Sequence, residues 1–232
     1  GNALFRFPDA DTVTEEDLRT GLCMVAPDMT YEVYAQKMQL MGGIVEAFVE
    51  GDLKTSPSVQ CRITPTGALE VISTHDQILG GDCGQVYLGA CFPADTEYSA
   101  ALGEIGLKIS EVLRAKGVLG RFGIDFVSVK KPHGWEHYAI EINLRKGGTT
   151  HPYLMLQYLT DGHYDHPSGK FIMPNGQTRF YIATDGLKND AYRRLTPEDL
   201  IDVSICRQVH FDHTIQEGVV FHLVGAISAY GK

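Results

Sequence analysis

The sequence predicts an α+β fold, in which antiparallel hairpins are mixed with helices. Two pairs of strand-like segments are joined by short turns, at Pro65-Thr66-Gly67 and at Pro132-His133-Gly134. Turns of this kind between strand-like segments are typical of antiparallel pairs. Between the two hairpins lies a segment whose apolar residues recur at helical spacing and which ends at Gly117. This order favours α+β over a doubly wound parallel sheet.

The composition is that of a folded protein with a sizeable core. Of 232 residues, 44% are apolar, and 20 basic residues stand against 29 acidic ones, for a net charge of −9. Non-specific binding to nucleic acid or to anionic membranes needs a positive surface, so we expect neither partner. No apolar run in the sequence approaches the ~18 residues of a membrane span.

Cysteine usage favours a reducing compartment. The number of cysteines is odd and no C-x-x-C pair occurs, which predicts free thiols rather than a disulfide framework. The five residues are Cys23, Cys61, Cys83, Cys91 and Cys206. We therefore expect a cytoplasmic protein.

In the N-terminal half, strand and helix patterns alternate. An opening strand is expected within residues 1–7, and Thr30 is expected to cap a helix that Gly42-Gly43 end. Four further strands are expected before the central helix, from their apolar and β-branched residues and their turn signals. They are Ile44–Val49, Val59–Thr64, Leu69–Ser73 and Val86–Cys91.

In the C-terminal half, Thr96 is expected to cap the central helix. The apolar stripe of that helix comprises Leu102, Ile105, Ile109, Val112 and Leu113. Two long strands, a helix, a loop and a last strand follow in order as Arg121–Val129, His137–Arg145, Pro152–Leu159, Asp161–Gln177 and Arg179–Thr184. Thr196 followed by Pro197 and two acidic residues is typical of a helix start.

Two carboxylates and an amide are expected on one face of the second hairpin. Side chains alternate faces along a strand, so Glu141 and Asn143 share one face, and Asp125 shares a face with Arg121. If the turn centres on His133, Asp125 lies opposite Glu141. The other face would be apolar and would contact the core through Phe122, Ile124, Phe126, Ile140, Ile142 and Leu144.

This polar face predicts a site for a hard divalent cation. Opposed carboxylates destabilise a sheet unless one is protonated or a cation is bound. Asp, Glu and Asn supply oxygen ligands, which suit Mg²⁺ or Mn²⁺. Arg145 projects from the same face, and Lys146 begins a Gly-Gly-Thr-Thr loop that would cradle phosphates. The alternative interpretation is a solvated strand face with cross-strand ion pairs.

These residues resemble the metal-binding signature of ATP-grasp carboxylate–amine ligases. The stretch Glu141-Ile142-Asn143-Leu144-Arg145 follows a strand with Gly123-Ile124-Asp125-Phe126. Three longer stretches are similar to ATP-grasp peptide ligases of the pheganomycin type: Ser73–Gly81, Phe92–Asp95 and Arg145–Pro152. The resemblance implies two antiparallel-sheet and helix subdomains with a nucleotide cleft between them.

The resemblance also implies a reaction and its residues. Such ligases use ATP to convert a carboxylate into an acyl phosphate, which an amine attacks to form an amide. Asp125, Glu141 and Asn143 would hold Mg²⁺ or Mn²⁺, and we assign catalytic roles to Arg145 and Arg121. Contacts to ATP are assigned to the adenine hinge and to three polar residues: Glu46, Ala47, Val49, His75, Gln77 and Lys146.

The resemblance divides the chain into an incomplete N-subdomain (1–92), a C-subdomain with the metal site (93–186) and a small C-terminal unit (187–232). The family's glycine-rich phosphate loop would precede Gly1, so we expect a C-terminal piece of a ligase, inactive alone. The expected partners are an amino-acid or peptide carboxylate and an amine acceptor. Two alternatives stay open: a nucleotide-binding or interaction module without turnover, and a metal-dependent phosphohydrolase.

Overall fold

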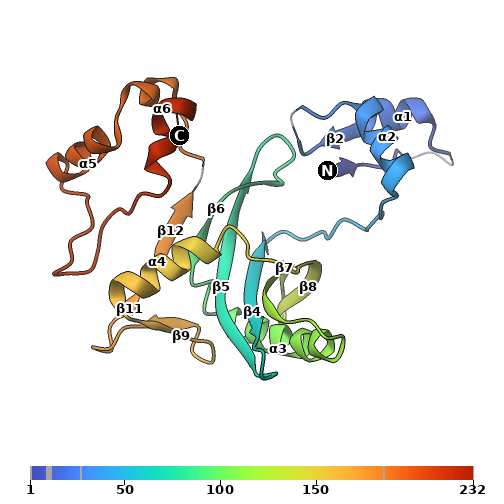
Figure 1. The fold of residues 1–232 in the computed structure, drawn as a ribbon. Helices are drawn as coiled ribbons and strands as arrows, with labels where there is room; N and C mark the ends of the chain where they lie inside the picture. Colours follow the sequence, from blue (N-terminus) through green and yellow to red (C-terminus); the bar gives the residue numbers. More distant parts are fainter. Residues whose placement is uncertain (1, 9–11, 27, 185, 232) are drawn as a thin grey trace.

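The computed structural model, which describes residues 2–8, 12–26, 28–184 and 186–231, is built around one antiparallel sheet (Figure 1). Its seven strands follow the order β12-β6-β5-β4-β7-β3, and β8 pairs with β7 as well. Their bounds are β3 (Lys54–Thr55), β4 (Pro57–Ile63), β5 (Leu69–Gly80), β6 (Val86–Phe92), β7 (Gly120–Lys131), β8 (Gly134–Asn143) and β12 (Tyr181–Thr184). The predicted α+β class is confirmed.

Helix α3 (Ser99–Ala115) packs on β4 and β5 and forms the larger core. This core contains Leu102 and Leu113 of the helix and the apolar set of β4 and β7: Val59, Cys61, Ile63, Phe122, Ile124 and Phe126. The helix approaches the sheet closely at Gly106, where an added Cβ would lie 2.9 Å from the Cys61 sulfur. The predicted apolar stripe is confirmed except for Val112, which is exposed.

The start of α3 differs from the prediction. Thr96 does not cap the helix, because the N-cap is Tyr98, which makes no side-chain capping bond. Asp95 organises this turn instead: its carboxylate accepts from the Glu97 N–H at 2.8 Å and its carbonyl accepts from the Tyr98 and Ser99 N–H groups. The side chain and the backbone carbonyl of Asp95, one residue before Thr96, therefore supply the hydrogen bonds that organise this turn.

A second core joins helix α4 (Thr150–Thr160) to a three-stranded sheet of β9 (His163–Asp165), β10 (Lys170–Ile172) and β11 (Thr178–Arg179). It contains Phe92, Tyr153, Tyr164 and Phe171. The prediction of a loop over residues 161–177 is wrong, because β9 and β10 form a hairpin there. Gly169, with φ of +67°, lies in the turn of that hairpin.

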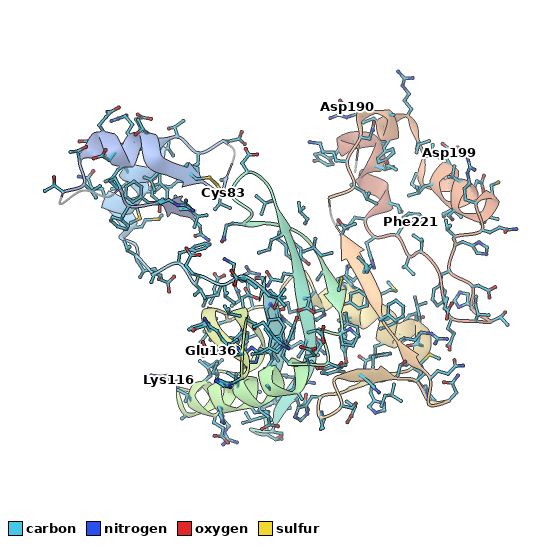
Figure 2. All side chains as sticks on the ribbon, turned by 180° about the vertical axis from the view of Figure 1, so that it is seen from behind. Cys83, Lys116, Glu136, Asp190, Asp199 and Phe221 are labelled. Carbon is cyan, nitrogen blue, oxygen red and sulfur yellow. A yellow bond between two sulfur atoms is a disulfide. The ribbon has the colours of Figure 1, made fainter. Side chains whose placement is uncertain are left out.

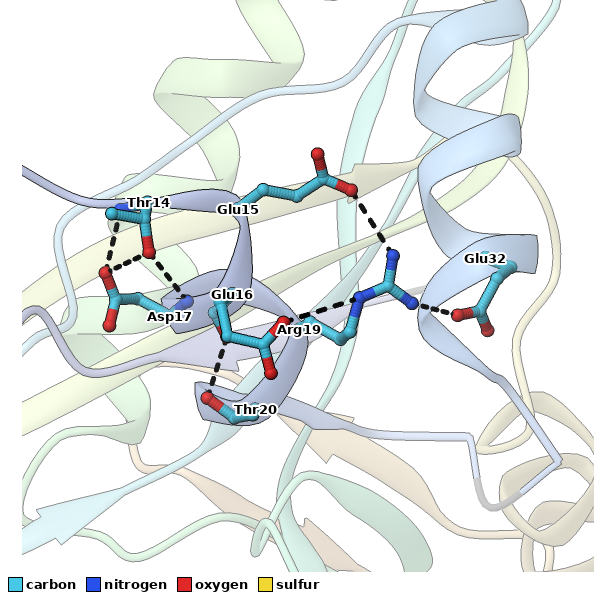
Figure 3. A network of polar contacts seen from close by, with 7 residues as sticks. All are labelled: Thr14, Glu15, Glu16, Asp17, Arg19, Thr20 and Glu32. Carbon is cyan, nitrogen blue, oxygen red and sulfur yellow. Dashed lines mark hydrogen bonds and ion pairs between the residues drawn. The ribbon is translucent and has the colours of Figure 1, made fainter.

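The N-terminal unit comprises β1 (Ala3–Phe5), α1 (Glu15–Gly21), β2 (Leu22–Met24) and α2 (Tyr31–Met41). The predicted Thr30 cap is confirmed, since its side chain accepts from the Val33 N–H, and Gly42 ends α2 with φ of +71°. Figure 3 shows how Arg19 of α1 ties the unit together through Glu15, Glu16 and Glu32.

The segment after α2 is not the predicted strand. Residues 42–51 carry no helix or strand and form a linker to the sheet. Ile44 and Val45, which strand propensity favoured, are 78% and 86% exposed. Without a neighbouring strand to pair with, β-branched residues do not form a strand, because sheet propensity depends on packing partners.

The C-terminal unit contains α5 (Pro197–Cys206) and the short helices η1 (Asp190–Arg194), η2 (Val224–Ala226) and α6 (Ile227–Tyr230), and α6 contacts both η1 and η2. The predicted start of α5 is confirmed: Thr196 and Asp199 form a reciprocal capping box, with Pro197 at the first helical position. None of the helices in the described residues is long and apolar enough to cross a membrane.

Not all five cysteines are free. Cys23 of β2 and Cys83, at the tip of the β5–β6 hairpin, form a disulfide, whereas Cys61, Cys91 and Cys206 are free (Figure 2). The expectation of five thiols is therefore wrong. A separation of 60 residues between the partners gave no local sequence signal for the pair.

Candidate functional site

A bulge in β8 places Glu141 opposite Asp125. From Lys131 and Gly134 the two strands pair regularly as far as Phe126 and Ala139; the register then shifts by one residue, and Asp125 pairs with Glu141. The turn is one residue tighter than predicted, and Ile140 in the bulge makes up the difference. The predicted opposition of the two carboxylates is confirmed, although the geometry that produces it was not foreseen.

Asp125 is the centre of a hydrogen-bonded group drawn from three strands. Its Oδ1 accepts from Gln77 Nε2 of β5 at 2.8 Å, and its Oδ2 accepts from Asn143 Nδ2 of β8 at 2.9 Å. Burial and the facing charge of Glu141 raise the pKa of Asp125 to about 6, while Gln77, Arg145 and Asn143 act in the opposite direction. The carboxylate is thus held in place at an energetic cost that a cation would relieve.

His75 lies on the same face as this group, two residues before Gln77 on β5, and does not reach solvent. Ser58 of β4 pairs with both Asp125 and His75, so all three share one face of the sheet. The His75 ring is fully buried, and its Nε2 lies 2.9 Å from the Tyr181 hydroxyl. Burial lowers the pKa of His75 to about 3, which keeps it neutral. Of the two residues predicted to approach ATP from β5, Gln77 reaches Asp125, whereas His75 is enclosed.

The apolar face predicted for β8 does not lie in the core. Ile140, Ile142 and Leu144 are 45%, 45% and 58% exposed. Helix α3 packs mainly on β4 and β5, whereas β8 pairs with β7 at the side of the sheet, so these side chains lie outside the main contact of the helix. The prediction failed because alternation indicates which residues share a face but not which part of a sheet a helix covers.

The basic residues of the candidate site lie in two places. Arg145 and Lys146 are exposed just beyond β8, where Arg145 Nη1 donates to the Lys146 carbonyl at 3.3 Å. Arg121 lies farther along β7 and lines a small hollow of about 10 Å³, open to solvent, at the start of α4. The other residues that line it are Gln60, Cys61, Ile72, Ser73, Thr150 and Tyr153. Arg121 therefore belongs to the same face as Asp125 but to a separate recess.

Gln60 of β4 lies between the hollow at Arg121 and the group around Asp125, and the sequence did not single it out as a site residue. Gln60 pairs with Gly123, and a Cβ added to Gly123 would lie 2.8 Å from Gln60 Nε2. The glycine thus lets the Gln60 amide lie flat on the sheet between Arg121 and Asp125. The sequence signal was available, since Gln60 alternates with the core residues Val59 and Cys61.

The three residues predicted as the adenine hinge lie in the linker. Glu46 and Ala47 are exposed, and the Val49 carbonyl accepts from Lys54 Nζ at 3.2 Å. The linker joins the N-terminal unit to the sheet, so these residues lie between the two parts of the chain (Figure 1).

The donor set at Asp125 fits a hard cation. Among the described residues there is no cluster of three or more His, Cys, Asp or Glu side chains arranged to hold a metal. The group here instead offers two carboxylates and one amide. Its oxygen donors suit Mg²⁺ or Mn²⁺, and the raised pKa of Asp125 marks the position where positive charge is favoured.

Comparison with known proteins finds a match to one protein family, whose members contain an ATP-grasp domain. Residues 27–167, more than half of the chain, match the model of the IQCH-like ATP-grasp domain. An L-propargylglycine–L-glutamate ligase from Streptantibioticus cattleyicolor is 32% identical over 200 residues, which cover 86% of this chain and 40% of the ligase. The IQ motif-containing protein H of zebrafish is 22% identical over 84% of this chain and 19% of its own length.

The chain therefore spans less than half the length of these two curated relatives. Among solved structures, a biotin carboxylase from Campylobacter jejuni is 18% identical over 54% of this chain and 27% of its own, with a TM-score of 0.43. The assignment to a family rests on the match over residues 27–167.

Proposed function

The chain belongs to the ATP-grasp family, and we propose that it is the core of an ATP- and Mg²⁺-dependent ligase that joins a carboxylate to an amine. The observation that carries the proposal is the group of Asp125, Glu141 and Asn143, which lies on paired strands and offers only oxygen ligands and amide donors. The ligase from Streptantibioticus cattleyicolor supports amino acids as substrates, since its name gives two of them.

The proposed reaction uses the residues in the following way. The substrate carboxylate attacks the terminal phosphorus of ATP, which gives an acyl phosphate and ADP, and the amine then displaces phosphate to form the amide. Asp125, Glu141 and Asn143 would hold Mg²⁺, which neutralises phosphate charge when bound. Gln77 and Asn143 fix the Asp125 carboxylate through hydrogen bonds of 2.8 and 2.9 Å. Arg145 and Lys146 would place positive charge beside the transferred phosphoryl group.

Three further assignments belong to the same proposal. We propose that the linker residues Glu46, Ala47 and Val49 contact the adenine, and that Arg121 with its recess receives part of the substrate. For His75 we propose an indirect role. It is buried and hydrogen-bonded to Tyr181, and it would hold β5 in the position from which Gln77 donates to Asp125. The division into 1–92, 93–186 and 187–232 stays a prediction, and strands from both sides of residue 92 pair in the large sheet.

The test compares two substitutions on one strand in the protein of full natural length. Glu141→Gln removes one charge opposite Asp125, whereas Glu136→Gln removes one charge near the other end of β8. There Glu136 pairs with Val129 and accepts from the Tyr138 hydroxyl at 2.9 Å. We expect Glu141→Gln to lower amine-dependent ADP release at least a hundredfold and to weaken Mg-ATP binding. Glu136→Gln should leave both within twofold. Equal turnover by the two variants would contradict the assigned metal site.

A second candidate function is a nucleotide-binding module without turnover. It is favoured by the match to the IQCH-like model and to a zebrafish relative whose name specifies no reaction. The same experiment separates the candidates: Mg-ATP binding without ADP release from any pool of amino acids supports the module. Phosphate release without an amine would instead support a phosphohydrolase.

A further inference from the structure

The Cys23–Cys83 disulfide joins two parts of the chain that form separate sheets. Cys23 lies in β2, which pairs with β1 in a two-stranded sheet, whereas Cys83 lies at the tip of the hairpin that β5 and β6 contribute to the large sheet. Figure 2 shows the labelled Cys83 where the hairpin meets the N-terminal unit. The bond therefore attaches the N-terminal unit to the far end of a long hairpin.

The N-terminal unit is held together by its own contacts. Arg19 forms ion pairs with Glu15, Glu16 and Glu32, and its guanidinium lies 4.5 Å from the centroid of the Tyr31 ring (Figure 3). The Thr14–Asp17 capping box fixes the start of α1. Released from the hairpin, this unit would move as one body.

The linker is the other covalent connection, and it gives little restraint. Residues 42–51 form no helix or strand, begin at Gly42 with φ of +71°, and are almost entirely exposed. The chain meets the sheet again near Gly51, where an added Cβ would clash with Val129 Cγ1. A segment without helix or strand fixes the reach of the N-terminal unit but does not by itself fix its position.

We propose that the disulfide is a redox-sensitive latch, which fixes the N-terminal unit to the β5–β6 hairpin when oxidised and releases it when reduced. Cys23 is exposed and Cys83 is half-buried, so a dithiol reductant has access. One thiolate of the reductant attacks the Cys23 sulfur and expels the Cys83 thiolate. Its second thiol then displaces Cys23 from the mixed disulfide, which leaves two cysteine thiols and the oxidised reductant.

The other cysteines do not compete for this exchange from within the core. Burial raises the pKa of Cys61 to about 11, and burial with the charge of Asp76 raises the pKa of Cys91. Both thiols stay protonated and unreactive at neutral pH. Cys206 is exposed in the C-terminal unit and would react with an alkylating reagent, so the test removes it.

A consequence for the site rests on the proposed function. Strand β5 carries both the hairpin tip and Gln77, which bonds Asp125, and the linker that joins the unit carries the proposed adenine contacts. A latched unit keeps one position relative to that site, whereas a released unit samples many and must be ordered again when nucleotide binds. We expect the reduced protein to bind Mg-ATP at least threefold more weakly.

The test uses the protein of full natural length with Cys206→Ser, with and without a further Cys23→Ser or Cys83→Ser. Amide hydrogen exchange is measured with and without dithiothreitol. Reduction, or either further substitution, should raise exchange at least tenfold in residues 81–85, at the tip of the hairpin. Exchange in α2, β4 and β7 should stay unchanged, because the released unit moves as one body. Alkylation before reduction should label neither Cys23 nor Cys83.

Unchanged exchange after reduction, or alkylation of both cysteines without reduction, would overturn the latch. Mg-ATP affinity that reduction leaves unchanged would overturn its effect on the site. These outcomes are separate from a failure of the ligase proposal, since a latched protein with no amine-dependent ADP release would still show the exchange difference.

Discussion

Asp125 owes its chemistry to four side chains that the sheet brings around it. Gln77 and Asn143 donate to its two oxygens, Arg145 contributes positive charge, and Glu141 faces it with a like charge. Burial and Glu141 prevail, and the pKa rises from an ordinary 3.8 to about 6. A carboxylate whose pKa is raised by burial and by a second carboxylate is a candidate for a functional site.

The pKa of Asp125 can be tested directly by carbon NMR titration of its carboxyl group. We expect a midpoint near pH 6, and Glu141→Gln should lower it because the facing charge is gone. Glu136→Gln should leave the midpoint unchanged. A midpoint near 4 in the unmodified protein, or one that Glu141→Gln does not move, would contradict this account of the site.

The sign of the effect on stability follows from the same shift. At pH values between 3.8 and 6 the folded chain holds a proton on Asp125 that the unfolded chain has lost. The contribution of the protonated Asp125 side chain to the free energy of unfolding is therefore present in full below pH 3.8, and it is lost as the pH rises through about 6. Above that pH, a bound divalent cation would offset the loss.

At the scale of elements, the bulge in β8 allows one hairpin to have one register near its turn and another at the candidate site. Near the turn, the two-residue connection pairs Ser128 with His137, whose Nδ1 lies 2.7 Å from the Ser128 hydroxyl. Near the site, Asp125 must face Glu141. A regular ladder in the register of the turn would place Ile140 opposite Asp125 and turn Glu141 to the α3 face. One extra residue allows both arrangements.

Two single-residue deletions test this role of the bulge. Deleting Ile140 leaves Glu141 opposite Asp125 in a regular ladder, so Mg-ATP affinity should stay within about threefold. Deleting Ile142 instead turns Asn143 to the opposite face and removes its 2.9 Å bond to Asp125, so affinity should fall at least tenfold. Ile140 and Ile142 are equally exposed, so the two deletions remove similar amounts of apolar contact and one serves as the control for the other. Equal affinities for the two deletions would exclude the register argument.

At the scale of the whole molecule, the sequence predicted what depends on local pattern. Alternation placed Asp125, Glu141 and Asn143 on one face, and helical spacing found α3 and α5. The failures concern tertiary context: Ile44–Val49 has no partner strand, the apolar residues at the end of β8 lie outside the α3 core, and Cys23 pairs with a cysteine 60 residues away. Each depends on which elements meet in space, and neither propensity nor alternation specifies that.

The linker and the disulfide together predict how the oxidised chain responds to limited proteolysis. Ile44, Val45 and Phe48 are large, apolar and exposed on a segment without helix or strand, so a protease that recognises such side chains should cut there first. Cys23 and Cys83 lie on opposite sides of that cut. The two fragments should therefore migrate as one species on a denaturing gel without reductant and as two with it. In Cys83→Ser they should separate under both conditions. First cleavage within β4 to β7, or separation of the oxidised fragments without reductant, would contradict the arrangement, because a unit joined only through the linker is lost once the linker is cut.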